Sequence, residues 1–254
     1  MITATRINST RISDILEREN LVILPPMDVF DSMALLVDSG IHIHCTMLDP
    51  WYNKGNGGAI PMDEYDRFIQ QLLNESALFS SLIYLWGFPE IIGPYVRFAP
   101  DDFYMASWLT WYYKNCPSVI RGWRSSQNAC LQFMKKGNKL YPEHFLTDEQ
   151  LEKYHNGKMR FVPGPPSVIE SPLLIGFIGK NEQTGHPSQK PEAVFEKLIL
   201  MATKEDDIIF DPMAGSGTTA SSAKKNNRKC IVCDVSEEYT QMIESRMAQE
   251  RIVL

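Results

Sequence analysis

The chain has 254 residues, 44% hydrophobic and 22% charged, a composition typical of a globular protein with one or two domains. Its five cysteines are an odd number, which argues against a disulfide framework and indicates a reducing compartment. No stretch approaches about 18 consecutive apolar residues, and the first residues lack the apolar run of a signal peptide. We therefore expect neither a membrane protein nor a small secreted or collagen-like one.

The net charge of −6 disfavours a protein that binds nucleic acid mainly through its phosphates. The charge is unevenly distributed, because residues 121–160 contain eight basic and only four acidic side chains. This local excess is typical of a solvated face, and it would also suit contact with phosphates. The basic side chains are Arg121, Arg124, Lys135, Lys136, Lys139, Lys153, Lys158 and Arg160.

Short apolar runs alternate with amphipathic segments of helical length, a pattern that predicts βαβ units and a mainly parallel sheet. Aromatic residues at 103, 108, 111 and 112 suggest one face of a helix, and this face is more typical of core than of a nucleotide platform. In the first half we expect strands at 21–24, 41–48, 78–86, 119–122 and 129–134, and helices at 29–37, 63–74 and 101–114.

Residues 137–185 are polar and interrupted by proline and glycine, which indicates a small inserted domain or a long functional loop. Regular patterns return after this segment. A helix at 191–203, a strand at 208–210, a helix at 218–226, a strand at 230–233 and a helix at 237–249 form a clear β-loop-α-β-α unit.

A glycine-rich motif, D-P-M-A-G-S-G-T-T at 211–219, lies between a predicted strand and a predicted helix. Gly215 and Gly217 allow a tight turn and a close approach of a ligand to the backbone. Asp234 ends the next predicted strand, where a carboxylate could accept hydrogen bonds from ribose hydroxyls. No Gly-Lys-Ser/Thr follows, which excludes a P-loop, but a dinucleotide fold and a turn without a ligand both remain open.

Two further motifs carry polar groups in positions suited to a ligand. Asp49-Pro50-Trp51-Tyr52 ends an apolar predicted strand, where a carboxylate, a rigid backbone carbonyl and two aromatic rings could face a base. The segment H-P-S-Q-K-P at 186–191 opens a helix with a hydroxyl and a lysine, which would suit a carboxylate ligand. Taken alone, the first motif is more often a simple turn with its aromatic rings in the core, and the second a simple helix entry.

Together, the three motifs resemble the β group of S-adenosylmethionine-dependent DNA amino-methyltransferases, which methylate adenine N6 or cytosine N4. That family has D-P-P-Y or S-P-P-Y first, then a target-recognition region, H-P-T-Q-K-P, D-P-F-x-G-S-G-T-T and a strand ending in an acid. The resemblance implies an α/β fold with a Rossmann-like, circularly permuted class I methyltransferase sheet of about seven mostly parallel strands, the last reversed. It implies a catalytic half at 1–136, a small inserted target-recognition region at 137–185 and a cofactor-binding half at 186–254.

The family's residue roles carry over to matching positions of this sequence. The tetrapeptide Asp49, Pro50, Trp51 and Tyr52 would be catalytic. The resemblance implies that Asp234 binds the cofactor ribose, that Ser188 and Lys190 contact the methionine end, and that Asp28 lies near the adenine. The glycine motif would hold the methionine part through Ala214, Gly215, Gly217 and Thr218, with Asp211 nearby.

The chemistry explains why such a site needs these residue types. An exocyclic amino group is a poor nucleophile, because its lone pair is delocalised into the ring. Acceptors at Asp49 Oδ and the Pro50 carbonyl would hold both N–H bonds and localise that lone pair, so that no metal is required. The target base would flip out of duplex DNA and stack on Tyr52. Trp51 replaces the second proline of the family, which leaves the shape of the base pocket open.

The resemblance implies transfer of a methyl group from S-adenosylmethionine to a base of double-stranded DNA. Adenine N6 is the expected target atom, because Asp begins the tetrapeptide and cytosine N4 enzymes of the family more often have Ser there. Cytosine N4, RNA, a non-catalytic cofactor- or nucleic-acid-binding partner and, more remotely, a nicotinamide dehydrogenase are the alternatives. The resemblance implies a cytoplasmic, nucleoid-associated protein of bacterial or phage type, of the restriction-modification kind, and allows a homodimer. Phosphate contacts are expected from Arg121, Arg124, Lys135, Lys136 and Lys139.

Other residues with metal-binding potential are expected to be structural. Cys230 and Cys233 lie three apart on a predicted strand and therefore face opposite sides, and no second cysteine pair accompanies them. His42 and His44 share one face of a predicted strand but have no acidic or cysteine partner in the sequence pattern. We therefore expect no metal site.

Overall fold

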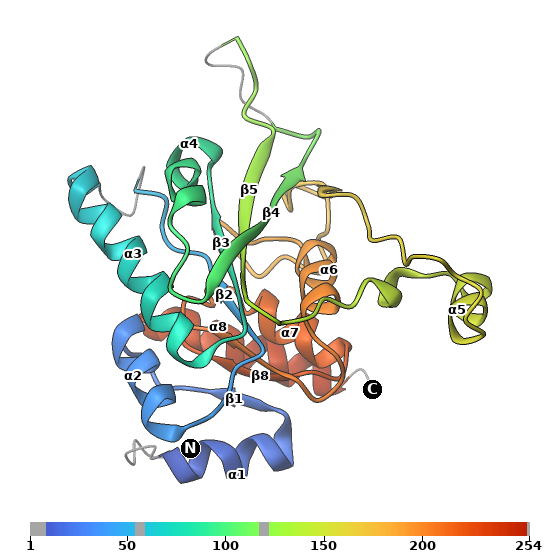
Figure 1. The fold of residues 1–254 in the computed structure, drawn as a ribbon. Helices are drawn as coiled ribbons and strands as arrows, with labels where there is room; N and C mark the ends of the chain where they lie inside the picture. Colours follow the sequence, from blue (N-terminus) through green and yellow to red (C-terminus); the bar gives the residue numbers. More distant parts are fainter. Residues whose placement is uncertain (1–8, 54–58, 117–121, 253–254) are drawn as a thin grey trace.

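The computed structural model describes residues 9–53, 59–116 and 122–252. Within these ranges the strands form one eight-stranded sheet in the order β1-β8-β7-β2-β3-β5-β4-β6 (Figure 1). Only β5 among them is reversed, and it lies inside the sheet between β3 and β4 rather than being its last strand. The strands are β1 (Leu21–Ile23), β2 (Cys45–Leu48), β3 (Leu82–Gly87), β4 (Phe103–Tyr112), β5 (Gln127–Lys135), β6 (Val168–Glu170), β7 (Ile208–Asp211) and β8 (Lys229–Val232).

Helices cover both faces of the sheet, so each face has its own apolar core. The first core contains Met33 and Leu36 of α2 (Val29–Ser39) and Ile69 of α3 (Met62–Phe79), together with residues of α1 (Ser9–Glu19) and α4 (Pro89–Ile92). The second core contains residues of α6 (Glu192–Ala202), α7 (Thr218–Lys225) and α8 (Glu237–Ile252), among them Leu198 and Ile243. This three-layer arrangement is typical of parallel α/β sheets, whose strands are buried on both sides.

The C-terminal strands β7 and β8 lie between two N-terminal strands of the sheet, β1 and β2, as the circular permutation predicts. Leu21 of β1 pairs with Cys230 of β8, and Cys45 of β2 pairs with Ile209 of β7, both in parallel. The β7–β8 unit therefore lies between two strands from the N-terminal part of the chain. This pairing confirms the mainly parallel α/β fold expected from the motifs.

The helix predicted at 101–114 is wrong, because these residues form β4, a ten-residue strand that pairs along its whole length with β5. Its five aromatic residues and Thr110 suit a strand. A bulge between Met105 and Ser107 shifts the register, which interrupts the two-residue alternation by which a strand is recognised in a sequence. The strand predicted at 119–122 falls largely on 117–121, which lie outside the described residues.

Several predicted boundaries also shift. Leu78 and Phe79 belong to the end of α3, and the strand expected at 78–86 begins only at Leu82. The strand expected at 41–48 is shorter, with a single bridge from Ile43 to Ser80 preceding β2. Among the described residues, no helix is long and apolar enough to cross a membrane.

Part of the segment 137–185 adds a strand to the edge of the sheet, and the rest projects away from the sheet. They contain the turn η3 (Pro142–Phe145), helix α5 (Asp148–His155) and strand β6, which pairs with β4 and supplies the eighth strand. Figure 1 shows α5 standing apart from the sheet, and none of its residues is buried. Thr147 and Gln150 form a capping box at its start, so its own end groups stabilise it. The recognition role of this region stays a prediction.

Candidate active site

Three carboxylates lie at the carboxyl ends of three adjacent parallel strands. Asp49 follows the last residue of β2, Asp211 is the last residue of β7, and Asp234 comes two residues after β8. Ligands bind at this edge of open α/β sheets, because the loops there diverge on either side of the sheet. The fold thus brings the two aspartates of the C-terminal unit next to the tetrapeptide of the N-terminal part.

The side chain of Lys190 joins the tetrapeptide to the helix-opening motif. Its Nζ forms an ion pair and hydrogen bond with Asp49 Oδ2, and only 4% of the lysine side chain is exposed. The ammonium also lies 5.3 Å from the ring centroid of Tyr52 and 5.6 Å from that of Trp86. The resemblance placed Lys190 at the methionine end of the cofactor and did not anticipate Asp49 as its partner, 141 residues away.

Tyr52 fixes the other oxygen of the same carboxylate. Its hydroxyl donates a hydrogen bond of 2.9 Å to Asp49 Oδ1, and its ring packs edge-on against Phe88 at 4.8 Å between centroids. Burial raises the pKa of the Tyr52 hydroxyl well above its ordinary value, and the negative charge of Asp49 raises it further. The hydroxyl therefore stays protonated, so Asp49 is held between one neutral and one cationic donor.

Trp51, which departs from the family pattern, packs against α3. Its ring centroid lies 5.5 Å from that of Tyr65 and 4.7 Å from that of Phe68, and its backbone carbonyl accepts a 2.7 Å hydrogen bond from Tyr65 Oη. The indole is 37% exposed, whereas the preceding Pro50 is buried. The substitution leaves the contacts of Asp49 with its two donors intact.

The glycine loop is closed by hydrogen bonds to Asp234. The N–H of Gly215 donates to Asp234 Oδ2 at 2.9 Å, and the N–H of Ser236 donates to Oδ1 at 2.9 Å. The carboxylate is buried, and each of its oxygens retains acceptor capacity beyond this one bond. Asp234 therefore orders the loop and still has lone pairs to offer a ligand with hydroxyl groups.

Both glycines of the loop are needed for close packing within the protein. Gly215 and Gly217 have φ values of +48° and +74°, in the left-handed region that favours glycine. A Cβ at Gly215 would lie 3.0 Å from His186 Nε2, and one at Gly217 would lie 3.1 Å from Ile243 Cγ1. His186, whose motif was identified but whose role was not, thus packs on the loop, and its ring contacts that of Tyr239 at 4.5 Å.

Asp211 supports the loop from inside the protein. Its carboxylate is 3% exposed and accepts hydrogen bonds from the Met213 N–H and from Thr219 Oγ1. The pKa of Asp211 is raised to about 7, chiefly by burial. The two hydrogen bonds lower this pKa, whereas the charges of Asp49 and Asp234 add to the increase. Asp211 therefore lies close enough to Asp49 and Asp234 to be influenced by their charges.

The remaining predicted cofactor residues also lie around this edge. Asp28 caps the start of α2 by accepting a 2.8 Å bond from the Phe30 N–H, and the neighbouring Met27 N–H donates to the Asp234 carbonyl at 3.3 Å. Thr218 Oγ1 donates to the Lys190 carbonyl at 3.1 Å. The other members are Ala214, which is buried, and Ser188, which is exposed. Their roles toward a cofactor stay predictions.

The predicted phosphate contacts do not gather at this edge. Because β5 is reversed, Lys135 and Lys136 lie at its opposite end, beside the start of β3, where the Lys135 N–H donates to the Ser81 carbonyl and Lys136 pairs with Asp102. Lys139 follows four residues after the end of β5. A duplex at Asp49 would reach these lysines only by passing around the sheet. The two arginines of the set differ: Arg124 is exposed just before β5, and Arg121 lies outside the described residues.

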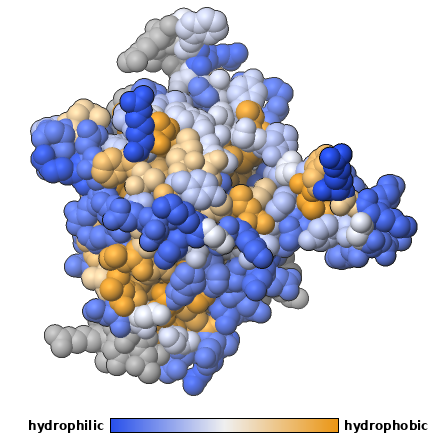
Figure 2. All heavy atoms as spheres, viewed as in Figure 1, coloured by the Kyte–Doolittle hydropathy of each residue, from blue (hydrophilic) through white to orange (hydrophobic). Residues whose placement is uncertain are grey.

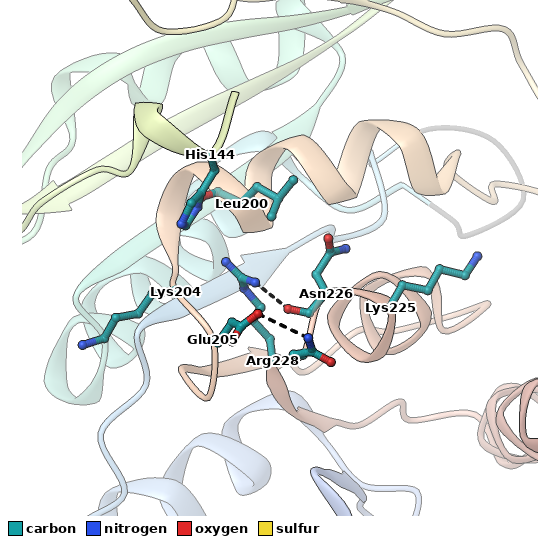
Figure 3. A pocket seen from close by; sticks show the side chains of 8 residues that line it. His144, Leu200, Lys204, Glu205, Lys225, Asn226 and Arg228 are labelled. Carbon is teal, nitrogen blue, oxygen red and sulfur yellow. Dashed lines mark hydrogen bonds between the residues drawn. The ribbon is translucent and has the colours of Figure 1, made fainter. Parts of the chain in front are cut away.

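The pocket of about 600 Å³ in Figure 3 also lies at the opposite edge, where β7 and β8 begin. Arg228 lines it, but its guanidinium donates to the carbonyls of Thr203 and Asn226 and therefore braces the ends of two helices. His44 pairs with Asp207, an acidic partner that the sequence pattern did not reveal, and accepts the Ile208 N–H. Within the described residues no cluster of three or more metal-ligating side chains occurs.

Comparisons with known proteins agree with this arrangement. The model of the N6/N4 DNA methylase family matches residues 43–245. DNA adenine methyltransferase YhdJ of Escherichia coli (strain K12) is 42% identical over 214 residues, which cover 76% of this chain and 72% of that protein. Several other curated relatives are type II methyltransferases, and the chain spans about half of their length.

Two solved structures share the fold at low sequence identity. The crystal structure of the M1.HpyAVI–SAM complex superposes with a TM-score of 0.67 at 20% identity and covers 89% of this chain and 98% of its own. The cytosine-N4-specific PvuII DNA methyltransferase superposes with a TM-score of 0.65 at 16% identity, covering 89% of this chain and 88% of its own. Since the family model spans most of the sequence, including all three motifs, the chain belongs to the N6/N4 DNA methylase family.

Proposed function

We propose that this protein transfers a methyl group from S-adenosylmethionine to an exocyclic amino group of a base in double-stranded DNA. The observation that carries the proposal is the bridge made by Lys190. Its side chain holds Asp49, and its backbone carbonyl accepts the Thr218 hydroxyl of the glycine loop. One residue thus joins the amine-binding tetrapeptide to the predicted cofactor loop, as transfer between two bound groups requires.

The residues at this edge fit S-adenosylmethionine. Asp234 has acceptor capacity for the ribose hydroxyls, Asp28 lies nearby at the start of α2, and the exposed Ser188 hydroxyl is free to face the methionine end. The Asp234 carboxylate supplies negative charge at this edge, which favours a cationic ligand, whereas Lys190 balances the charge of Asp49. When bound, the cofactor supplies an electrophilic methyl group on a positively charged sulfur.

The tetrapeptide would orient the nucleophile. Asp49 Oδ and the Pro50 carbonyl accept the two N–H bonds of the amine, so that its lone pair is drawn out of conjugation with the ring. Tyr52 and Lys190 occupy one lone pair on each Asp49 oxygen and leave the others for the base. Because both donors are buried or partly buried, the carboxylate is held in one orientation before the base arrives.

Adenine N6 is the proposed target atom. Asp begins the tetrapeptide, as is typical of adenine enzymes in the family that the sequence resembles, and YhdJ is a DNA adenine methyltransferase. Cytosine N4 is the second candidate, favoured by the shared fold of the PvuII enzyme. A non-catalytic partner is disfavoured, because Trp51 packs against α3 and leaves the contacts of Asp49 intact. The proposed setting is the DNA of a bacterial or phage-infected cell.

Incubation with methyl-labelled S-adenosylmethionine and unmethylated DNA, followed by nucleoside chromatography, tests the proposal. We expect label in N6-methyldeoxyadenosine, whereas label in N4-methyldeoxycytidine would replace adenine by cytosine as the target. Asp49→Ala should abolish transfer while cofactor affinity, measured by calorimetry, changes little, because Asp234 and the glycine loop remain. A wild-type turnover in this variant would contradict the role of the tetrapeptide.

A further inference from the structure

An apolar tip projects from the segment that connects β6 to the 186–191 motif. Phe177 is 92% exposed at this tip, and its neighbours Ile175 and Ile178 are 41% and 40% exposed. Neither burial nor ring packing explains an almost fully exposed phenylalanine on this turn. Neighbouring exposed apolar side chains such as these three are typical of surfaces that contact another molecule, whereas single ones are common on any protein.

The turn that presents Phe177 is held rigidly by its own residues. The Gln183 side-chain amide donates to the carbonyls of Gly176 and Ile178, at 3.2 and 2.7 Å. Gly179 adopts a φ of +64°, and a Cβ there would lie 2.4 Å from Leu174 Cδ2, so the backbone at Gly179 packs closely on the Leu174 side chain. These contacts within the turn fix the position of Phe177 relative to the rest of the segment.

Both ends of the turn are attached at the edge of the sheet that carries Asp49. Leu173 exchanges two hydrogen bonds with the Asn115 side chain, just beyond the carboxyl end of β4, at 2.8 and 2.9 Å. At the other end, the Gln189 side chain donates to the Glu182 carbonyl at 2.7 Å, and Gln189 directly precedes Lys190. The turn is therefore linked by a hydrogen bond to Gln189, the neighbour of the residue that holds Asp49.

We propose that Phe177 is a wedge that enters the base stack of duplex DNA and fills the space vacated by the flipped target base. This inference rests on the proposed function, because a base inside a duplex cannot reach Asp49 unless it leaves the stack. Apolar side chains inserted between base steps replace part of the stacking lost on unpairing. Lys180, exposed on the same turn, would meet a backbone phosphate.

The shape and size of the tip favour DNA over a second copy of the chain. A stable protein interface buries about 800 Å² on each partner, which three side chains on one turn do not supply. A wedge needs only one projecting ring on a firm base, which is what Phe177, Gln183 and Leu173 provide. Insertion beside the catalytic edge would also retain the base during transfer.

The test compares two duplexes that carry the sequence modified by the wild-type protein, identified by mapping methylated bases in treated genomic DNA. One duplex is fully paired, and the other has an abasic site opposite the target base, so that flipping no longer breaks a base pair. Phe177→Ala should lower kcat/KM about 30-fold on the paired duplex but less than about threefold on the other. Phe177→Trp should retain most of the activity. Phe161 is another exposed phenylalanine, and Phe161→Ala should leave kcat/KM unchanged on both duplexes.

Three results would overturn the wedge. The first is an unchanged kcat/KM of Phe177→Ala on the paired duplex, and the second is an equal loss of kcat/KM on both duplexes. The third is a wild-type dimer that becomes a monomer in Phe177→Ala, measured by sedimentation, which would place a second copy of the chain on the tip. Because Phe177 is exposed, unfolding curves should coincide with those of the wild type. A wild-type protein that methylates neither duplex contradicts the proposed function itself, whereas an active wild type with an unaffected variant refutes only the wedge.

Discussion

Lys190→Met separates two roles for the lysine that bridges the site. The substitution keeps the length and apolar stem of the side chain but removes the ammonium that contacts Asp49 Oδ2. If Lys190 positions Asp49, the variant should lose turnover and keep most of its cofactor affinity. If the lysine instead binds the methionine end of the cofactor, as the family resemblance implied, cofactor affinity should fall and turnover at saturating cofactor should be retained.

The size of the effect follows from burial. Removal of one partner from a buried ion pair costs about 3 to 5 kcal/mol, because the remaining charge loses its compensation. The Asp49 side chain is 21% exposed and keeps its bond from Tyr52, so the loss of unfolding free energy should be at the lower end, about 3 kcal/mol. Loss of one donor to a preorganised catalytic group lowers kcat by about 100-fold, and we expect the same here.

Turnover would be measured with labelled cofactor at saturation, the dissociation constant of the cofactor by calorimetry, and unfolding free energy by urea denaturation. Lys197→Met serves as the matched control, because Lys197 is exposed on α6. The control should behave as the wild type in all three measurements. A dissociation constant raised more than about 30-fold with an unchanged kcat would refute the positioning role.

Three other substitutions test neighbouring contacts. Tyr52→Phe keeps the ring but removes the 2.9 Å bond to Asp49, so kcat should fall about tenfold with unchanged cofactor affinity, and equal activity would show that the hydroxyl is dispensable. Trp51→Ala removes indole packing on α3, which should lower the unfolding free energy in urea by about 1 to 2 kcal/mol, and an unchanged midpoint would contradict that packing. Burial raises the pKa of Asp211 from 3.8 to about 7, so between these values the folded state keeps a proton that the unfolded state releases, and stability falls as pH rises. Asp211→Asn should reduce this fall between pH 4 and 7 by up to about 4 kcal/mol in urea titrations, and parallel pH profiles would argue against the raised pKa.

The C-terminal third illustrates where local sequence is sufficient. The strand and helix predicted at 208–210 and 218–226 are observed as β7 and α7 within about one residue at each end. Glycine and proline punctuate this part densely, and they act through the backbone of their own position. In β4, by contrast, a bulge between Met105 and Ser107 removes the alternation on which a local prediction depends, and only pairing with β5 makes the segment a strand.

The amino-acid sequence by itself determined the α/β class, the order of the motifs and the candidate residues, because each motif depends on contiguous positions. Only the tertiary structure decided that Lys190 pairs with Asp49, that Trp51 packs on α3, and that Lys135 and Lys136 lie at the far edge of the sheet. These outcomes depend on contacts between distant parts of the chain and on the direction of β5. Side-chain partners across such distances are set by the packing of the whole sheet, which no short segment encodes.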